Sequence, residues 1–214
     1  MIVWVAGWPH CGSTLIREFI QETFGHNSFS KYLEKKLAFR FGPESVEFSK
    51  HWSPKHYMEC RQSKKLFLIK THEAPVDDSP AIYVQRDGRD AVVSLSHFWP
   101  DHTLHDLITA QYIRFMDWST MYRAWHPQDR PNTLYLKFDE IINEPEETAF
   151  QIETAFEWDR IGEFTDTTFA DGKENFPRLY NDRFNVWQKE LVGANLELFN
   201  RLHGDVMKEC GYAD

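Results

Sequence analysis

Short apolar runs recur along the chain and predict the strands of a buried sheet. Four such runs are rich in aliphatic, aromatic and β-branched residues. Continuous runs of this kind are typical of strands that are covered on both faces. The predicted strands are residues 2–6, 66–70, 81–85 and 133–138.

Segments with the apolar period of a helix lie between and after these runs. They predict helices over residues 14–23, part of 31–41, 90–97, 104–124, 146–157 and 194–210. Alternating strands and helices favour a largely parallel sheet with crossover helices. Because no repeat, low-complexity tract or linker interrupts this pattern, we expect residues 1–214 to form a single α/β domain with a mostly parallel central sheet flanked by helices.

The loop after the first predicted strand has the features of an anion-binding site. Residues 7–14 are Gly-Trp-Pro-His-Cys-Gly-Ser-Thr and lead directly into a predicted helix. Such a loop presents backbone N–H groups and the partial positive charge of a helix N-terminus, and both favour a phosphate. The spacing from Gly7 to Gly12 is that of a nucleotide P-loop, but Ser13 stands where the Walker lysine belongs. The loop therefore predicts a P-loop-like phosphate site that differs from that of ordinary ATPases.

Polar residues also follow two further predicted strands, and ligands of parallel sheets bind at these carboxyl ends. Lys70 and His72 lie at the end of the second strand, and histidine is the side chain best suited to accept a proton near neutral pH. Arg86 follows the third strand, and Ser94 lies about two turns into the next helix. A guanidinium and a hydroxyl in these places can bind one anion. Taken singly, His72 and Arg86 also fit structural roles; their common position at strand ends favours a site.

Composition and charge narrow the class of function. The chain has 214 residues, a net charge of −9 and a pI near 5.6, which argues against binding to nucleic acid or to an anionic membrane. No segment approaches the ~20 apolar residues of a membrane span, and the first apolar run is too short for a signal sequence. Three cysteines form no paired framework, and neither they nor the histidines at 97, 102 and 105 match a standard metal site. We expect a cytoplasmic protein without a metal ion.

Together these motifs resemble those of the sulfotransferases that use 3′-phosphoadenosine 5′-phosphosulfate (PAPS). The family's first motif, approximately P-K/R-S-G-T-T, is similar to residues 9–14, and its second, K-T-H, matches residues 70–72. Its third motif, an arginine and a serine separated by seven residues, lies within a Y-x-x-R-x-x-R/K-D-x-x-V-S-x-x-x-F pattern that residues 83–98 follow. A later Y-E-D-L-x-x-x-P segment is similar to residues 138–145. The resemblance covers residues 1–158 and weakens afterwards.

The resemblance implies transfer of the sulfonyl group from PAPS to a hydroxyl or amine of a small-molecule or glycan acceptor, with adenosine 3′,5′-bisphosphate (PAP) as product and no metal ion. His72 is implied to be the general base, and Lys70 to offset charge on the transferring group. His10 stands where the family has lysine or arginine beside the leaving oxygen. An imidazolium favoured by bound phosphates would keep that hydrogen bond, so we expect activity to fall above neutral pH more steeply than in lysine-bearing relatives.

The resemblance also assigns the donor site. Phe138 replaces a tyrosine that commonly packs near the adenine, and Arg178 or Arg183 would take the place of a C-terminal loop whose glycines this chain lacks. The family's dimer signature is absent, so the oligomeric state stays open. The implied donor-binding residues are His10, Cys11, Gly12, Ser13, Thr14, Arg86, Ser94, Phe138 and Arg178.

Two other interpretations remain open. A P-loop nucleoside or small-molecule kinase would need a lysine where Ser13 stands and a Mg²⁺-binding aspartate after a strand, for which Asp87 is the one candidate. A catalytically inactive relative that only binds the nucleotide would keep the same motifs.

Overall fold

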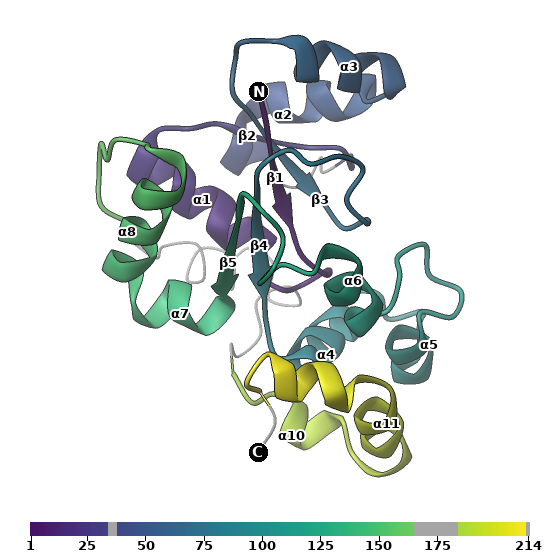
Figure 1. Ribbon diagram of the computed structural model, residues 1–214. Helices are drawn as coiled ribbons and strands as arrows, with labels where there is room; N and C mark the ends of the chain where they lie inside the picture. Colours follow the sequence, from purple (N-terminus) through teal and green to yellow (C-terminus); the bar gives the residue numbers. More distant parts are fainter. Residues whose placement is uncertain (34–37, 165–183, 213–214) are drawn as a thin grey trace.

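The computed structural model describes residues 1–33, 38–164 and 184–212, and a parallel sheet forms its centre (Figure 1). The strands, in the spatial order β2-β3-β1-β4-β5, are β1 (Ile2–Ala6), β2 (Ser28–Ser30), β3 (Phe67–Thr71), β4 (Ala81–Gln85) and β5 (Thr133–Lys137). All four neighbouring pairs run parallel, and Ala6 pairs with both Thr71 and Tyr83. The carboxyl ends of β1, β3 and β4 therefore meet at one edge, and the predicted α/β fold is confirmed.

Helices connect the strands and continue beyond β5. They are α1 (Ser13–Phe24), α2 (Ala38–His51), α3 (Pro54–Gln62), α4 (Gly88–Phe98), α5 (Leu104–Thr109), α6 (Trp118–Trp125), α7 (Phe138–Asn143), α8 (Pro145–Phe156), α10 (Trp187–Glu190) and α11 (Gly193–Glu209).

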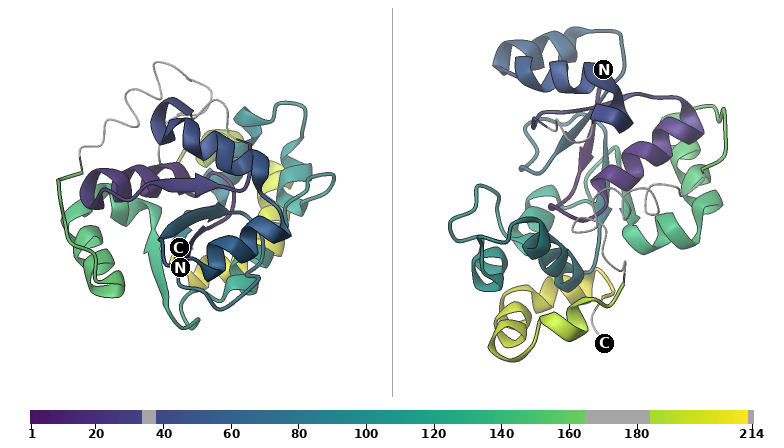
Figure 2. Two further views of the ribbon diagram at one scale, coloured as in Figure 1. Left: turned by 90° about the horizontal axis from the view of Figure 1, so that it is seen from above. Right: turned by 180° about the vertical axis from the view of Figure 1, so that it is seen from behind.

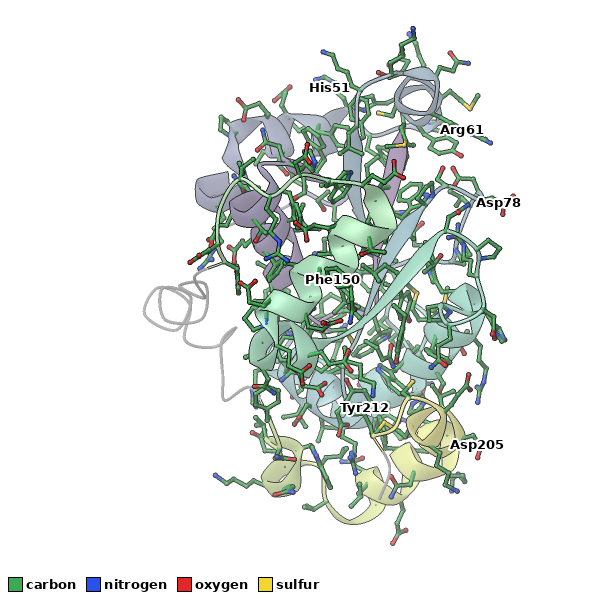
Figure 3. The ribbon with its side chains drawn as sticks, turned by 60° about the vertical axis from the view of Figure 1, so that its left-hand side comes forward. His51, Arg61, Asp78, Phe150, Asp205 and Tyr212 are labelled. Atoms are coloured by element: carbon green, nitrogen blue, oxygen red, sulfur yellow. The ribbon has the colours of Figure 1, made fainter. Side chains whose placement is uncertain are left out.

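The helices pack against both faces of the sheet. Figures 1 and 2 show α1 and α8 on one side and α5 and α6 on the other. Because side chains alternate along a strand, Val3 and Val5 of β1 pack with apolar residues of α1, α7 and α8. On the outer side of α8, Phe150 lies outside this core and is exposed (Figure 3).

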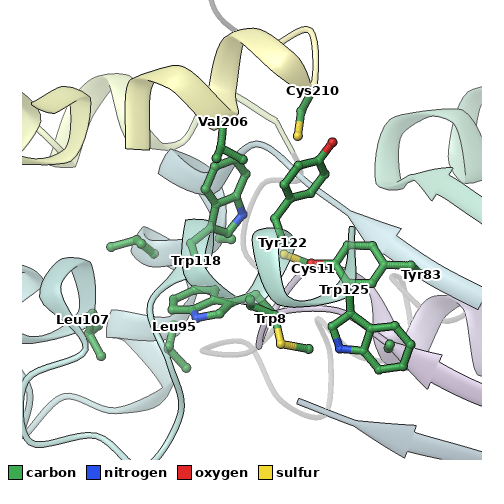
Figure 4. Packing of buried hydrophobic residues seen from close by; sticks show 14 of the residues in the cluster. Trp8, Cys11, Tyr83, Leu95, Leu107, Trp118, Tyr122, Trp125, Val206 and Cys210 are labelled. Atoms are coloured by element: carbon green, nitrogen blue, oxygen red, sulfur yellow. The ribbon is translucent and has the colours of Figure 1, made fainter. Parts of the chain in front are cut away.

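The opposite face holds a core rich in aromatic residues (Figure 4). Trp4 and Ala6 of β1 face this side, together with residues of α4, α5, α6 and α11. Trp8, Trp118 and Trp125 are each 1% exposed. This core fixes α4, which carries Ser94, relative to the loop that follows β1.

The helix predicted over residues 104–124 is wrong as a single element. α5 begins at a capping box between Thr103 and Asp106 and ends at Ala110, whose backbone is left-handed with φ 56°. The side chain of Asp117 then accepts the N–H of Thr120 and starts α6. The left-handed turn at Ala110 and the cap at Asp117 outweigh the apolar period of the sequence. The segment between the two helices carries Arg114 and Phe115 to the region described below.

The apolar pattern also does not identify β2, α3 and α7. β2 has only three residues, and two of them are the buried serines Ser28 and Ser30. The helix predicted within residues 31–41 lies at Ala38–His51 instead, with a kink where Gly42 adopts φ 76° before Pro43.

Candidate active site

The loop between β1 and α1 lies tightly against the end of β4. Gly7 and Gly12 have φ of 153° and 105°, which L side chains rarely adopt. A Cβ at Gly7 would lie 2.5 Å from the carbonyl oxygen of Val84, and one at Gly12 would lie 2.6 Å from the ring of Phe138. The helix begins at Ser13, so the predicted strand, Gly-bounded loop and helix start are all present. Glycine is required at these two positions because neither has room for a side chain.

We expect Gly12→Ala to lower the free energy of unfolding by about 2–4 kcal/mol, because the new methyl group would both strain the backbone and overlap Phe138. Urea denaturation measures this loss. Gly204→Ala is the matched control, since a Cβ at Gly204 in α11 meets nothing within 4 Å. Helix propensity predicts that this control is more stable by up to about 1 kcal/mol. Equal stabilities of the two variants would contradict the tight contact.

Arg86, Ser94 and His10 come together at this loop. Arg86 follows β4 and donates from Nη1 to the carbonyl oxygen of His10 at 3.1 Å. Nδ1 of His10 lies 2.8 Å from Oγ of Ser94. The guanidinium carbon of Arg86 lies 4.5 Å from the ring centroid of Phe138, and the residue is only 8% exposed. The structure thus gathers four of the residues that the sequence predicted for donor binding.

His10 is neutral near pH 7 in this arrangement. Burial, followed by the positive charges of Arg86 and Lys70, lowers the pKa of His10 from 6.5 to about 3. Its backbone is left-handed, with φ 62°. A protonated His10 therefore requires bound anions that overcome both burial and the nearby positive charges. The expected fall in activity above neutral pH stays a prediction.

The lowered pKa of His10 makes stability depend on pH. Because the unfolded chain takes up a proton at His10 near pH 6.5 and the folded one does not, stability falls as the pH drops below 6.5. For this partly buried ring we expect His10→Asn to remove about 1 kcal/mol of the stability loss between pH 7.5 and 5.5. Urea denaturation at several pH values measures it. Asparagine tolerates left-handed backbone, and His126→Asn, at an exposed histidine with φ 45°, is the matched control for the effect of the substitution itself.

His72 lies across the same edge of the sheet and faces the loop. Its Nδ1 lies 2.7 Å from the carbonyl oxygen of Gly7. A carbonyl oxygen only accepts, so Nδ1 carries the proton and a neutral ring has its lone pair on Nε2. The backbone N–H of His72 donates to Oη of Tyr32 at 2.8 Å. The Nδ1 contact fixes the ring in the tautomer that a general base requires, and the backbone contact holds Tyr32 beside it.

Lys70 and His72 both lie against the ring of Tyr32, which lines a pocket with aromatic walls. Lys70 is 8% exposed, and its Nζ lies 6.0 Å from the ring centroid of Tyr32. The His72 ring stacks on Tyr32, with centroids 5.4 Å apart, and meets the edge of Phe115 at 5.6 Å. An open pocket of about 270 Å³ adjoins these rings and is lined by Lys31, Tyr32, Trp52, Glu73, Arg114 and Phe115.

The sequence pattern did not identify these pocket residues. Tyr32 follows the short strand β2, Trp52 lies between α2 and α3, and Phe115 lies in the segment that was predicted to be helical. Apart from the nearness of Glu73 to His72, no local motif marks them. Only the fold brings them together.

The remaining predicted donor-binding residues differ in position. Cys11 is 1% exposed in the aromatic core, burial raises the pKa of its thiol to about 12, and its N–H donates to the carbonyl oxygen of Trp8. Its side chain is therefore a small core residue and not a reactive thiol. Ser13 and Thr14 lie in the first turn of α1. Arg178 and Arg183 lie outside the described residues.

Within residues 1–33, 38–164 and 184–212, no group of three or more His, Cys, Asp or Glu side chains is placed to hold a metal ion. In the same part of the chain, no helix has the length and apolar character needed to cross a membrane.

Comparison with solved structures supports this fold. The chain is similar to the mouse sulfotransferase SULT7A1 complexed with PAP, with 15% identity and a TM-score of 0.68 over 99% of this chain and 88% of that one. It is similar to retinol dehydratase in complex with androsterone and the inactive cofactor PAP (13% identity, TM-score 0.64, 97% and 81% covered). It is also similar to the sulfotransferase domain of the Synechococcus PCC 7002 olefin synthase (14% identity, TM-score 0.52, 100% and 95% covered).

The sequence itself gives the family. No curated protein sequence matches the chain. The profile of the sulfotransferase domain, however, matches residues 2–175, which include every motif described above. The predicted class of enzyme, a PAPS-dependent sulfotransferase, is thereby confirmed at the level of the family. The chain belongs to the sulfotransferase domain family.

Proposed function

We propose that this protein transfers the sulfonyl group of PAPS to a hydroxyl or amine of a small-molecule acceptor, with His72 as general base. The observation that carries the proposal is the hydrogen bond from Nδ1 of His72 to the carbonyl oxygen of Gly7. It assigns the proton to Nδ1 and the lone pair to Nε2, and it ties the ring to the predicted donor loop.

The residues at the strand ends fit the donor. Bound PAPS would supply the sulfonyl group and a phosphate leaving group. The first-turn N–H groups of α1, from Ser13 on, have no carbonyl partner within the helix and suit the 5′-phosphate. Arg86 and Ser94 would hold the 3′-phosphate, with Phe138 beside them. Solved relatives described with PAP support this choice of donor.

The proposed chemistry needs a base and nearby cations. His72 would take the acceptor proton at Nε2 as the acceptor atom attacks sulfur. Lys70 would stabilise negative charge on the sulfonyl oxygens. His10 would donate one N–H to the leaving oxygen in place of the usual lysine or arginine. Retinol dehydratase, whose solved structures hold androsterone or retinol, favours a small-molecule acceptor over a glycan.

The location and the domain organisation are parts of the same proposal. Cys11, Cys60 and Cys210 are buried free thiols, which suits a reducing, cytoplasmic compartment. Residues 1–214 would form one domain.

The kinase interpretation requires Asp87 to bind Mg²⁺, and the contacts of this residue argue against that role. Asp87 accepts the N–H of Arg89 as the cap of α4 and pairs with the Arg89 guanidinium at 2.7 Å. Its carboxylate is therefore engaged in holding the helix start. Thermal-shift measurements separate the two interpretations, since PAP should stabilise a sulfotransferase whereas ADP with Mg²⁺ should stabilise a kinase.

The direct test is turnover of ³⁵S-labelled PAPS with a panel of phenols, alcohols, amines and glycans. We expect label to appear in at least one small hydroxyl or amine compound. Binding of PAP without transfer to any member of the panel would instead favour the inactive relative.

A further inference from the structure

Arg114 adds a positively charged group to the lining of the pocket beside His72. His72 and Arg114 contact the same two aromatic rings from different positions. The guanidinium carbon of Arg114 lies 5.2 Å from the ring centroid of Tyr32 and 5.0 Å from that of Phe115. The His72 ring lies 5.4 Å and 5.6 Å from the same two centroids. A ligand resting on these rings would meet the base at one end and the guanidinium at the other.

The walls between the two ends suit a flat ring. Tyr32 and Phe115 meet edge to face, with centroids 5.7 Å apart and planes at 87°. Trp52 adds a third aromatic wall to the pocket, whose volume is about 270 Å³. Aromatic faces and edges arranged in this way bind planar aromatic ligands well.

The charges of the pocket favour an anion at the Arg114 end. The one carboxylate among the described residues of its lining, Glu73, is 2.6 Å from Nζ of Lys31 and is neutralised by it. Among the described residues, no carboxylate pairs with Arg114, which is held over the two rings alone. Lys70 adds a further positive charge near Tyr32. In a chain of net charge −9, this concentration of cations attracts acidic ligands and repels amines.

We propose that the acceptor is an aromatic hydroxyl compound that carries an anionic group, and that Arg114 binds that group. This inference rests on the proposed sulfonyl transfer and specifies its acceptor. The hydroxyl oxygen forms a bond to sulfur, and the bond from sulfur to the bridging phosphate oxygen breaks with its electron pair remaining on PAP. The hydroxyl proton passes to Nε2 of His72. Arg114 acts in binding and takes no part in the proton transfer.

Three phenols of similar size but different charge test the proposal. They are 3-(4-hydroxyphenyl)propionate, its uncharged amide, and the cationic tyramine. We measure KM by transfer of ³⁵S from PAPS, and Kd by calorimetry with PAP bound. A charge-assisted hydrogen bond at an exposed guanidinium predicts about a tenfold lower KM and Kd for the propionate than for the amide. Tyramine should bind most weakly.

Variants of Arg114 identify the residue responsible. Arg114→Gln should remove the preference for the propionate over the amide, and Arg114→Glu should favour tyramine. Arg123→Gln, at an exposed arginine of α6 outside the pocket lining, is the matched control and should keep the wild-type preference. Equal KM values for the three phenols, or a preference that survives Arg114→Gln, overturns the inference while leaving sulfonyl transfer intact. Absence of transfer to any compound, together with no PAP binding, overturns the proposed function instead.

Discussion

His72→Asn should lower kcat for sulfonyl transfer by about 100- to 10,000-fold, the usual contribution of a positioned general base. Asparagine places an N–H near the position of Nδ1 and so keeps the bond to the carbonyl oxygen of Gly7. It has no nitrogen that accepts a proton at the position of Nε2. The effect should therefore fall on the chemical step.

Two measurements separate loss of the base from general damage. The Kd for PAP, measured by calorimetry, should stay within about twofold of wild type, and the urea midpoint should change little, because the Gly7 contact survives. A variant that binds PAP normally and retains full kcat would refute the role of His72. A variant that loses PAP affinity would show a structural role for the ring.

Arg86→Lys should weaken PAP binding by about 10- to 100-fold although the positive charge is kept. Lysine cannot reproduce the fork of a guanidinium or its stacking, and here the guanidinium both contacts the carbonyl oxygen of His10 and lies over Phe138. Calorimetric titration with PAP measures the change. The loss should be smaller for adenosine 5′-phosphate, because that compound has no 3′-phosphate for Arg86 to hold.

The control for this substitution is Arg123→Lys on α6, which should leave the Kd for PAP unchanged. If Arg86→Lys weakens PAP and adenosine 5′-phosphate equally, then Arg86 only shapes the loop. An unchanged Kd for both nucleotides would remove Arg86 from the donor site.

The parts of the fold that the sequence predicted best are those fixed by continuous burial. β1 and β4 have the predicted bounds because every one of their residues is buried. β3 is shifted by one residue from its prediction, and β5 ends at Lys137 because Phe138 opens α7. The loop at 7–14 was recognisable because two of its positions with positive φ are occupied by glycines at a fixed spacing.

The pocket that Tyr32 and Phe115 line could not be predicted in the same way. Its residues come from segments around 31, 52, 73 and 114, and their meeting depends on the break between α5 and α6. That break lies between the left-handed Ala110, which ends α5, and the capping side chain of Asp117, which starts α6. The protonation state of His10 could also not be predicted from the local sequence. Its pKa depends on burial and on Arg86, which lies 76 positions away.

The two C-terminal helices are attached to the helix that carries Ser94. The carboxylate of Asp90 in α4 accepts the N–H groups of Asn185 and Trp187, and Nε2 of His97 lies 2.6 Å from a carboxylate oxygen of Glu190. At the start of α4, a Cβ on Gly88 would overlap Trp118 of α6 and Phe199 of α11. Any change that loosens residues 184–212 therefore reaches Ser94 through α4. These helices hold α4 in place, and we expect that removing them would shift Ser94 relative to His10.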